Sequence, residues 1–387
     1  MRLLRWACIA LLALAGCALP LAPPAPDPLL APHLRLIGVA ELPPGTEYGG
    51  TTIGGLSGID YDPAQDRYLF ISDSAAQIFS ARLHYGSQGL AAPQFTGVQA
   101  LQHASGQPFA PWWRPQAGMD RPDAEALRWL PDSGHFLWTS EGDFAPGFGP
   151  QLRASRIDGT PVRDIPLPAS FMPASGKGPR RNGTLEGLAL SPDGQTAWLA
   201  MELPWRQDGD EATPESGGAP VRITAIDLAT GRPLRQIAYQ PDAVPQTRAL
   251  PGPQINGVSE ILADGPQHLL VLERSYSAGR GFTARLYRID TRAGSDTLAL
   301  DALTAANHHS APKTLVADLA ALGLRPDNIE GMTWGAPLQG GAQGSGCVLV
   351  FVSDDNFNPA QVTQFIAAEY LPLRGGHERC GTSAARP

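Results

Sequence analysis

Five stretches of the chain share one pattern of apolar and polar positions. Each begins with a small or acidic residue and continues with an apolar run, a tight polar turn, a second apolar run and another acidic residue. The turns contain residues typical of reverse turns, for example Asp62-Pro63 and Ser191-Pro192-Asp193-Gly194. The pattern therefore predicts pairs of antiparallel strands within residues 56–73, 124–141, 185–202, 258–273 and 329–354.

Each pair is followed by further apolar runs that predict additional strands. Four antiparallel strands in every repeat are typical of a β-propeller, so we expect an all-β fold. The last repeat has only three strands of its own, and the segment Leu34–Leu42 is expected to supply the fourth and to close the ring. Residues 297–318 have room for extra strands, so the predicted β-propeller has five or six four-stranded blades. A β-sandwich is the alternative fold, but it does not account for the matching acidic positions.

Residues 1–16 have the pattern of a bacterial export signal peptide. Arg2 and Arg5 precede an apolar stretch that is too short to span a bilayer. The stretch ends in Leu14-Ala15-Gly16-Cys17, which resembles the lipobox of bacterial lipoproteins. The resemblance implies cleavage before Cys17 and attachment of a lipid to its thiol. An ordinary cleaved signal peptide with a chance cysteine is the alternative.

The segment that follows the signal peptide predicts a protein held at the cell envelope. Residues 17–33 are rich in proline and are expected to form a semi-rigid tether behind the lipid. Ala18 is not the aspartate associated with inner-membrane retention of such lipoproteins, so we expect the outer membrane, facing the periplasm or the exterior. The propeller is then expected to span residues 34–373, followed by a C-terminal tail at 374–387.

Two cysteines remain in the mature domain beyond the lipid anchor. An exported protein enters an oxidising compartment in which disulfides persist. We therefore expect Cys347 and Cys380 to form a disulfide that pins the C-terminal tail to the domain. Two unpaired thiols are the alternative.

Composition narrows the classes of function. The formal net charge is −8, and the only lysines are Lys177 and Lys313, so nucleic acid is not expected as a partner. The chain contains 43 glycines and 38 prolines, which agrees with many short elements joined by turns. We expect a monomer that acts on a small molecule and is attached to the membrane through its lipid anchor.

The repeat pattern also brings acidic residues together. If the first strand of each repeat lines the central channel, its start and the end of the second strand lie at the same mouth. The first expected set is Ser57, Glu125, Glu186, Ser259 and Glu330. The second expected set is Asp73, Glu141, Glu202, Glu273 and Asp354. So many carboxylates repel one another unless cations or arginines neutralise them, and calcium suits such a site because it binds hard oxygen ligands in flexible geometry.

Several residues of this mouth have expected roles. Asp354 and Asp355 form the densest cluster of oxygen ligands. Arg274 is expected to bind phosphate or carboxylate oxygens with its rigid fork of N–H groups. Glu202 or Glu273 is expected to accept the proton of a water molecule, provided that it does not bind metal. The alternative is that the acids cap strands by accepting backbone N–H bonds and pair with arginines.

Three runs within the repeats resemble the phytase-like family, which is described as having the esterase-like activity of phytase. These runs are Asp123–Leu127, Thr184–Gly194 and Asn328–Met332, the last supported by Val352–Phe357. The similarity extends over most of the mature domain. Related β-propeller phytases are calcium-dependent enzymes that cleave phosphate from inositol phosphates, and they hold calcium with acidic residues at the channel mouth.

The resemblance implies a calcium site and an activity. It implies that the calcium ligands include Glu125, Glu186, Glu330 and Asp354. With the neighbouring acids added, the expected metal site is Asp73, Glu125, Glu186, Glu330, Asp354 and Asp355. The predicted function is calcium-dependent hydrolysis of a small phosphorylated or ester substrate by an exported lipoprotein. The alternative is a non-catalytic propeller lipoprotein that binds a ligand or an envelope partner.

Overall fold

The computed structural model describes residues 33–73, 76–110, 120–131, 133–144, 147–338 and 346–371. The chain divides into two units, Met1–Ala31 and Pro32–Pro387, and all described residues belong to the second unit. Within these described ranges, no helix is both long enough and apolar enough to cross a membrane.

Some sequence predictions fall on residues that the structure does not describe. The signal peptide, nearly all of the tether with Cys17, and the tail at 374–387 lie outside the described residues. Cys347 lies directly before a strand of the last blade and is disulfide-bonded. Its expected partner, Cys380, lies outside the described residues, so the pairing stays a prediction.

The described domain is built from five four-stranded antiparallel sheets, the blades. Blade 1 contains β4 (Leu56–Asp62), β5 (Arg67–Ser72), β6 (Gln77–Arg82) and β9 (Gln94–Ala100). Blade 2 contains β10 (Ala124–Leu130), β11 (His135–Ser140), β12 (Gln151–Arg156) and β13 (Pro161–Ile165). Blade 3 contains β14 (Leu185–Leu190), β15 (Thr196–Met201), β16 (Val221–Asp227) and β17 (Pro233–Tyr239). Blade 4 contains β18 (Gln254–Ala263), β19 (His268–Ser277), β20 (Gly281–Asp290) and β21 (Lys313–Asp318). Blade 5 contains β22 (Asn328–Trp334), β23 (Val348–Asp354), β24 (Thr363–Tyr370) and β1 (Leu34–Leu42).

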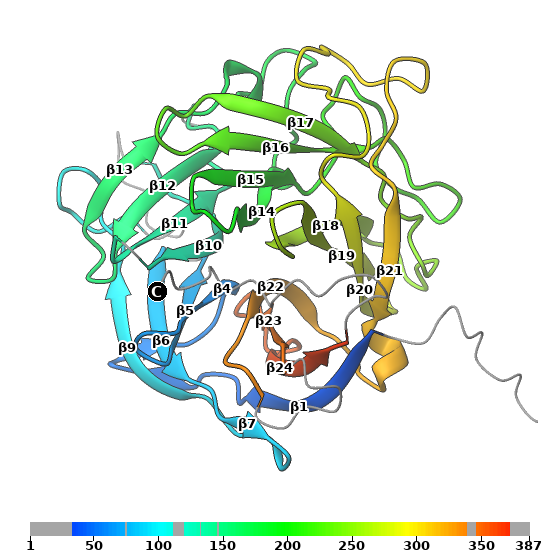
Figure 1. Cartoon of the computed structure of the whole chain (residues 1–387). Helices are drawn as coiled ribbons and strands as arrows, with labels where there is room; N and C mark the ends of the chain where they lie inside the picture. Colours follow the sequence, from blue (N-terminus) through cyan, green and yellow to red (C-terminus); the bar gives the residue numbers. More distant parts are fainter. Residues whose placement is uncertain are drawn as a thin grey trace, which may run out of the picture. The chain divides into compact units, whose positions relative to one another are not determined.

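The blades form a closed ring around the inner strands β4, β10, β14, β18 and β22. Each inner strand contacts the next one in this order, and β22 contacts β4 (Figure 1). The fold is therefore a β-propeller, as the repeat pattern predicted, and of the two blade numbers left open it has five. The region at 297–318 does not form a sixth blade, because its strand β21 is the outer strand of blade 4.

The N-terminal strand closes the ring, as the sequence predicted. β1 pairs with β24 in antiparallel register from Leu34 opposite Tyr370 to Leu42 opposite Thr363. The order β1-β24-β23-β22 places β1 at the outer edge of blade 5. The last blade therefore contains strands from both ends of the domain.

Apolar packing joins blade 5 to blade 1 across this closure. Leu56, Phe70, Val352 and Phe365 are fully buried members of one cluster. The rings of Phe70 and Phe365 meet edge to face, with their centroids 5.5 Å apart, which is a preferred geometry for aromatic pairs. Since burial of apolar surface is the dominant favourable term in folding, this cluster holds the first and last blades together.

A buried ion pair crosses the middle of the ring. Arg128 on β10 lies with its Nη2 2.8 Å from Oε2 of Glu260 on β18. Arg128 also donates hydrogen bonds to the carbonyl oxygens of Ile59 on β4 at 3.0 Å and of Ile261 at 2.8 Å. Glu260 accepts a hydrogen bond of 3.0 Å from the N–H of Leu188 on β14. One ion pair thus ties the inner strands of four blades together.

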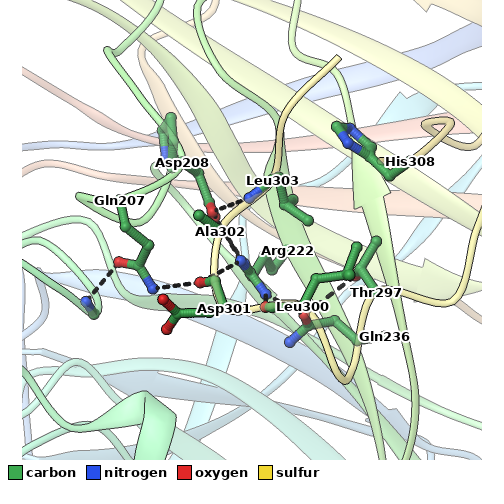
Figure 2. A network of polar contacts seen from close by, with 12 residues as sticks. Gln207, Asp208, Arg222, Gln236, Thr297, Leu300, Asp301, Ala302, Leu303 and His308 are labelled. Atoms are coloured by element: carbon green, nitrogen blue, oxygen red, sulfur yellow. Dashed lines mark hydrogen bonds and ion pairs between the residues drawn. The ribbon is translucent and has the colours of Figure 1, made fainter. Parts of the chain in front are cut away.

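A second buried arginine fixes the long excursion between β20 and β21. Figure 2 shows Arg222 of β16 between Asp208 and this excursion. The guanidinium donates two hydrogen bonds to the Asp208 carboxylate, at 2.7 and 2.8 Å, and one of 2.8 Å to Gln236 of β17. It also donates to the carbonyl oxygens of Leu300 at 3.0 Å and Asp301 at 3.2 Å. The network attaches an excursion of blade 4 to blade 3.

Candidate metal and active site

Every inner strand has a β-bulge at the same position near the mouth of the channel. In β4 the register shifts between Leu56 and Gly58, and the other inner strands shift at the corresponding place. A bulge leaves an unpaired residue and redirects its side chain. The residues at the bulges are Ser57, Glu125, Glu186, Ser259 and Glu330, all of them buried. They are the first set that the sequence predicted.

Glycines after the bulges let neighbouring inner strands approach closely. A Cβ atom on Gly58 would lie 2.6 Å from the carbonyl oxygen of Glu125 in the next blade. A Cβ atom on Gly331 would lie 3.0 Å from the carbonyl oxygen of Ser57. Only glycine avoids these backbone clashes without a shift of the strands. The glycines therefore set the spacing at which the bulged side chains meet.

The second set differs from the prediction in blade 4. In blade 1, the residue opposite the start of the inner strand is Ser72, and Asp73 follows it. In blade 4, the residue in this place is Glu273, and Arg274 follows it. By this register the second set is Asp73, Glu141, Glu202, Arg274 and Asp354. The prediction that Glu273 belongs to the ring was wrong by one residue.

Glu273 lies outside the cavity and is fully hydrogen-bonded. Its Oε1 accepts hydrogen bonds from the Tyr239 hydroxyl at 2.5 Å and the Lys313 ammonium at 2.6 Å. Its Oε2 accepts from the N–H of Asp242 at 3.0 Å and the side-chain amide of Asn256 at 2.8 Å. Glu273 is not among the described residues that line the cavity. This geometry gives it a structural role rather than that of a proton acceptor.

The two sets enclose a cavity of about 1360 Å³ at the mouth of the ring. The described residues that line this cavity include Arg274 and Asn328, together with many aspartates and glutamates. The acids that converge on its floor are Asp73, Asp123, Glu125, Glu141, Glu186, Glu202, Glu330 and Asp354. The structure therefore brings together five of the six predicted metal ligands, with Asp355 as the exception. Asp123 and Glu141 join them although they were not predicted as ligands.

Two groups of carboxylates are close enough to hold a metal ion. One group is Asp123, Glu125 and Glu141, and the other is Glu141, Glu186 and Glu202. Within each group the oxygen atoms lie within 4.8 Å of one another. Glu141 belongs to both groups. An all-oxygen set of carboxylates is the kind of site that binds calcium.

Two glutamates of these groups differ in their hydrogen bonding. Oε1 of Glu141 accepts the N–H of Gly183 at 2.7 Å and also the N–H of Thr184, which fixes the carboxylate. Glu186 is only 7% exposed, and its Oε2 has no hydrogen-bond partner in the part of the chain that the structure describes. A buried carboxylate oxygen without a donor is costly unless a cation or a proton meets it. Glu186 is therefore suited to act as a ligand of a metal ion.

Arg274 neutralises one side of the ring. Its Nη2 lies 3.0 Å from Oε1 of Glu202 and 3.4 Å from Oε1 of Glu330. Glu330 also accepts a hydrogen bond of 2.7 Å from the side-chain amide of Asn328. Of the glutamates at the bulges, Glu330 is thus already paired, whereas Glu125 and Glu186 face other carboxylates.

The predicted ligands at the end of β23 have separate roles. Oδ1 of Asp355 accepts the N–H of Gly55 at 3.0 Å and of Phe357 at 3.1 Å, so Asp355 ties blade 5 to blade 1. Asp354 lines the cavity with Asp73, and its Oδ1 accepts a backbone N–H at 2.7 Å. Burial, and then the Glu330 and Asp73 charges, hold the pKa of Asp354 well above its usual value.

The electrostatics of the ring favour a bound proton or cation. Burial, followed by repulsion from nearby carboxylates, raises the pKa of Glu141 to about 8. Burial and the charge of Glu186 hold the pKa of Glu125 well above its usual range. Burial raises the pKa of Glu330 to about 7, although the Arg274 charge opposes the shift. The cavity therefore binds protons more readily than the same acids would in water, and the repulsion between its carboxylates also favours a cation.

The chain was compared with known proteins. The sequence model of a family described as "Phytase-like: Esterase-like activity of phytase" matches residues 51–357. No curated protein matches the chain.

The chain is similar to several solved structures with which it shares little sequence identity. Hydrazine synthase from Kuenenia stuttgartiensis is 12% identical. The match covers 84% of this chain and 67% of the hydrazine synthase chain, with a TM-score of 0.35. A luciferin-regenerating enzyme is 12% identical, and the match covers 85% of this chain and 97% of that enzyme, with a TM-score of 0.38. The Dos1 propeller is 7% identical, and the match covers 90% of this chain and 97% of the Dos1 chain, with a TM-score of 0.34. At such identities and scores, these likenesses carry no information about activity.

The raised pKa values predict how the stability of the metal-free protein depends on pH. An acid whose pKa is higher in the folded protein binds its proton more tightly there. Its contribution to stability is therefore present below the ordinary pKa, near 4.5, and is lost as pH rises toward about 8 for Glu141. In EDTA, the melting temperature should fall between about pH 5 and pH 8. Glu141→Gln should reduce this fall, and a melting temperature in EDTA that is constant or rising over the range would contradict the electrostatic analysis.

Proposed function

The chain belongs to the phytase-like family, and from that premise we propose that it hydrolyses phosphoric esters with calcium at the acidic mouth of its propeller. The observation that carries the proposal is the pair of carboxylate groups that share Glu141. Glu186 supports it, because Oε2 of this buried side chain has no donor among the described residues. The ring has seven carboxylates and one arginine, and this excess of negative charge favours a cation.

The residues that would hold calcium are those of the two groups. Glu125, Glu141 and Glu186 form the centre, with Asp123 and Glu202 at the two ends. All of them offer hard carboxylate oxygens, which calcium prefers over nitrogen or sulfur ligands. When bound, calcium supplies positive charge that polarises a phosphoryl oxygen and lowers the pKa of a nearby water molecule.

Arg274 and Glu202 are suited to act on the substrate directly. Arg274 lines the cavity with its side chain 11% exposed, while its Nη2 pairs with Glu202 and Glu330. Its guanidinium would bind a phosphate oxygen, which matches its fork geometry. Burial raises the pKa of Glu202 although the Arg274 charge opposes the shift, so Glu202 is suited to accept a proton near neutral pH when calcium is held by the other four acids.

The first test separates a ligand role from a structural one. Glu186→Gln keeps the size of the side chain and removes its charge, and Glu215→Gln is the matched control on an exposed loop. At a hundredfold excess over Kd, calcium should stabilise the wild type by about 2.7 kcal/mol. We expect Glu186→Gln to lower calcium affinity by at least about tenfold. In EDTA this variant should melt at the same or a higher temperature, because repulsion is relieved.

Activity is measured on the same proteins as release of 4-nitrophenol from 4-nitrophenyl phosphate. We expect release by the wild type and by Glu215→Gln that EDTA abolishes, and little release by Glu186→Gln. Release that persists in EDTA would contradict the calcium dependence. Intact calcium binding without release from any of several esters would favour the non-catalytic, ligand-binding propeller instead.

We also propose that Cys17 anchors the protein to the cell envelope through a lipid, because Leu14-Ala15-Gly16-Cys17 follows an apolar stretch of signal-peptide length. Cys17→Ala should leave an uncleaved precursor that no longer labels with palmitate. Cys8→Ala, within the signal peptide, is the control and should be processed and labelled normally. Equal labelling of both variants would rule out the lipid at Cys17.

A further inference from the structure

Blade 4 alone extends past the mouth of the ring. Its strands β18, β19 and β20 each have 10 residues. The first two strands of every other blade have 6 or 7 residues. β19 continues beyond Arg274 to Ser277, whereas the second strands of the other blades end at or before the ring position. The extra length forms a wall beside the acidic cavity.

An apolar row lies on the cavity side of this wall. Ile255 pairs with Tyr276, and Tyr276 pairs with Phe282, so the three side chains lie on one face of the sheet. The rings of Tyr276 and Phe282 are 4.7 Å apart between centroids, at an angle of 47°. All three residues are half-buried and line the cavity. Leu324, also half-buried, lines the cavity from the segment before β22.

The strand β19 fixes the position of this apolar row relative to Arg274. Arg274 and Tyr276 are two residues apart on β19, so both side chains lie on the same face of the strand. Two residues of a strand span about 7 Å. An ester whose phosphate contacts Arg274 would therefore place the group on its ester oxygen against Tyr276 and its neighbours.

We propose that this row, Ile255, Tyr276 and Phe282, binds an apolar alkyl or aryl group of the substrate. This inference rests on the proposed function and specifies its substrate as a phosphoric ester of a hydrophobic alcohol rather than a polyphosphorylated polyol. The acidic floor would bind the cation and the phosphate end, and the half-exposed rings would lose their contact with water when the apolar end covers them. A highly charged polyol would leave these rings uncovered and gain nothing from them.

The test compares two esters that share a phosphate but differ in the alcohol. The substrates are 1-naphthyl phosphate and glycerol 2-phosphate, with calcium present. The variants are Tyr276→Ser and Phe282→Ser, and Leu234→Ser, at a 52% exposed site on β17, is the matched control. We expect each wall variant to lower kcat/KM for 1-naphthyl phosphate by about tenfold or more and to leave glycerol 2-phosphate within about twofold. Melting curves identify a variant that fails to fold, and Ile255→Gln then tests the same row from β18.

A binding measurement separates this inference from the proposed function. Calorimetric titration with 1-naphthyl phosphate in calcium should show tighter binding to the wild type than to the wall variants. If neither ester is hydrolysed but this difference in binding is found, the hydrolase proposal fails and the apolar site stands. If both esters are hydrolysed and the variants change them equally, or not at all, the apolar site is wrong and the hydrolase stands.

Discussion

Repulsion between buried carboxylates is the constraint on which this structure depends. Three bulge glutamates and four acids of the second set share one mouth with a single ring arginine, Arg274. Backbone N–H groups fix Glu141, and Arg274 pairs with Glu202 and Glu330. Neither Glu125 nor Glu186 forms an ion pair with an arginine or lysine among the described residues, and Arg274 acts on Glu186 only at longer range. The negative charge that remains uncompensated therefore favours the binding of protons or of a metal ion, and the proposed chemistry depends on that binding.

The fold holds these charges together against their repulsion. Five bulges at equivalent positions place the first set around the channel, and each bulge is held in a sheet whose inner strand contacts two neighbours. Arg128 and Glu260 tie four inner strands together in the middle of the ring. The closure by β1 adds apolar packing between the first and last blades. Because the strands fix the backbone positions of the acids, the repulsion between them favours a bound cation.

The pattern of apolar and polar positions was sufficient to predict the fold, but it did not predict every residue of the candidate site. It predicted the strand pairs, the three-stranded last repeat and the closing strand Leu34–Leu42, because these depend on periodicity and turn residues. It left the blade number open, because an outer strand such as β21 looks like the start of a new repeat. It placed Glu273 in the ring instead of Arg274, because the pattern required an acidic residue at the end of the second apolar run, and blade 4 has an arginine at that position. The Arg128–Glu260 pair was missed because charged residues within a strand normally indicate a solvent-exposed face.

The central claim is that the acidic mouth is a cation site, and a crystal structure grown with calcium tests it most directly. Data collected where calcium scatters anomalously locate the ion without reference to any activity. The account predicts an anomalous peak at coordination distance, about 2.3–2.6 Å, from oxygens of Glu141 and Glu186. A map with no peak in the cavity, in which Oε2 of Glu186 accepts an ordinary hydrogen bond from water or protein, would contradict it.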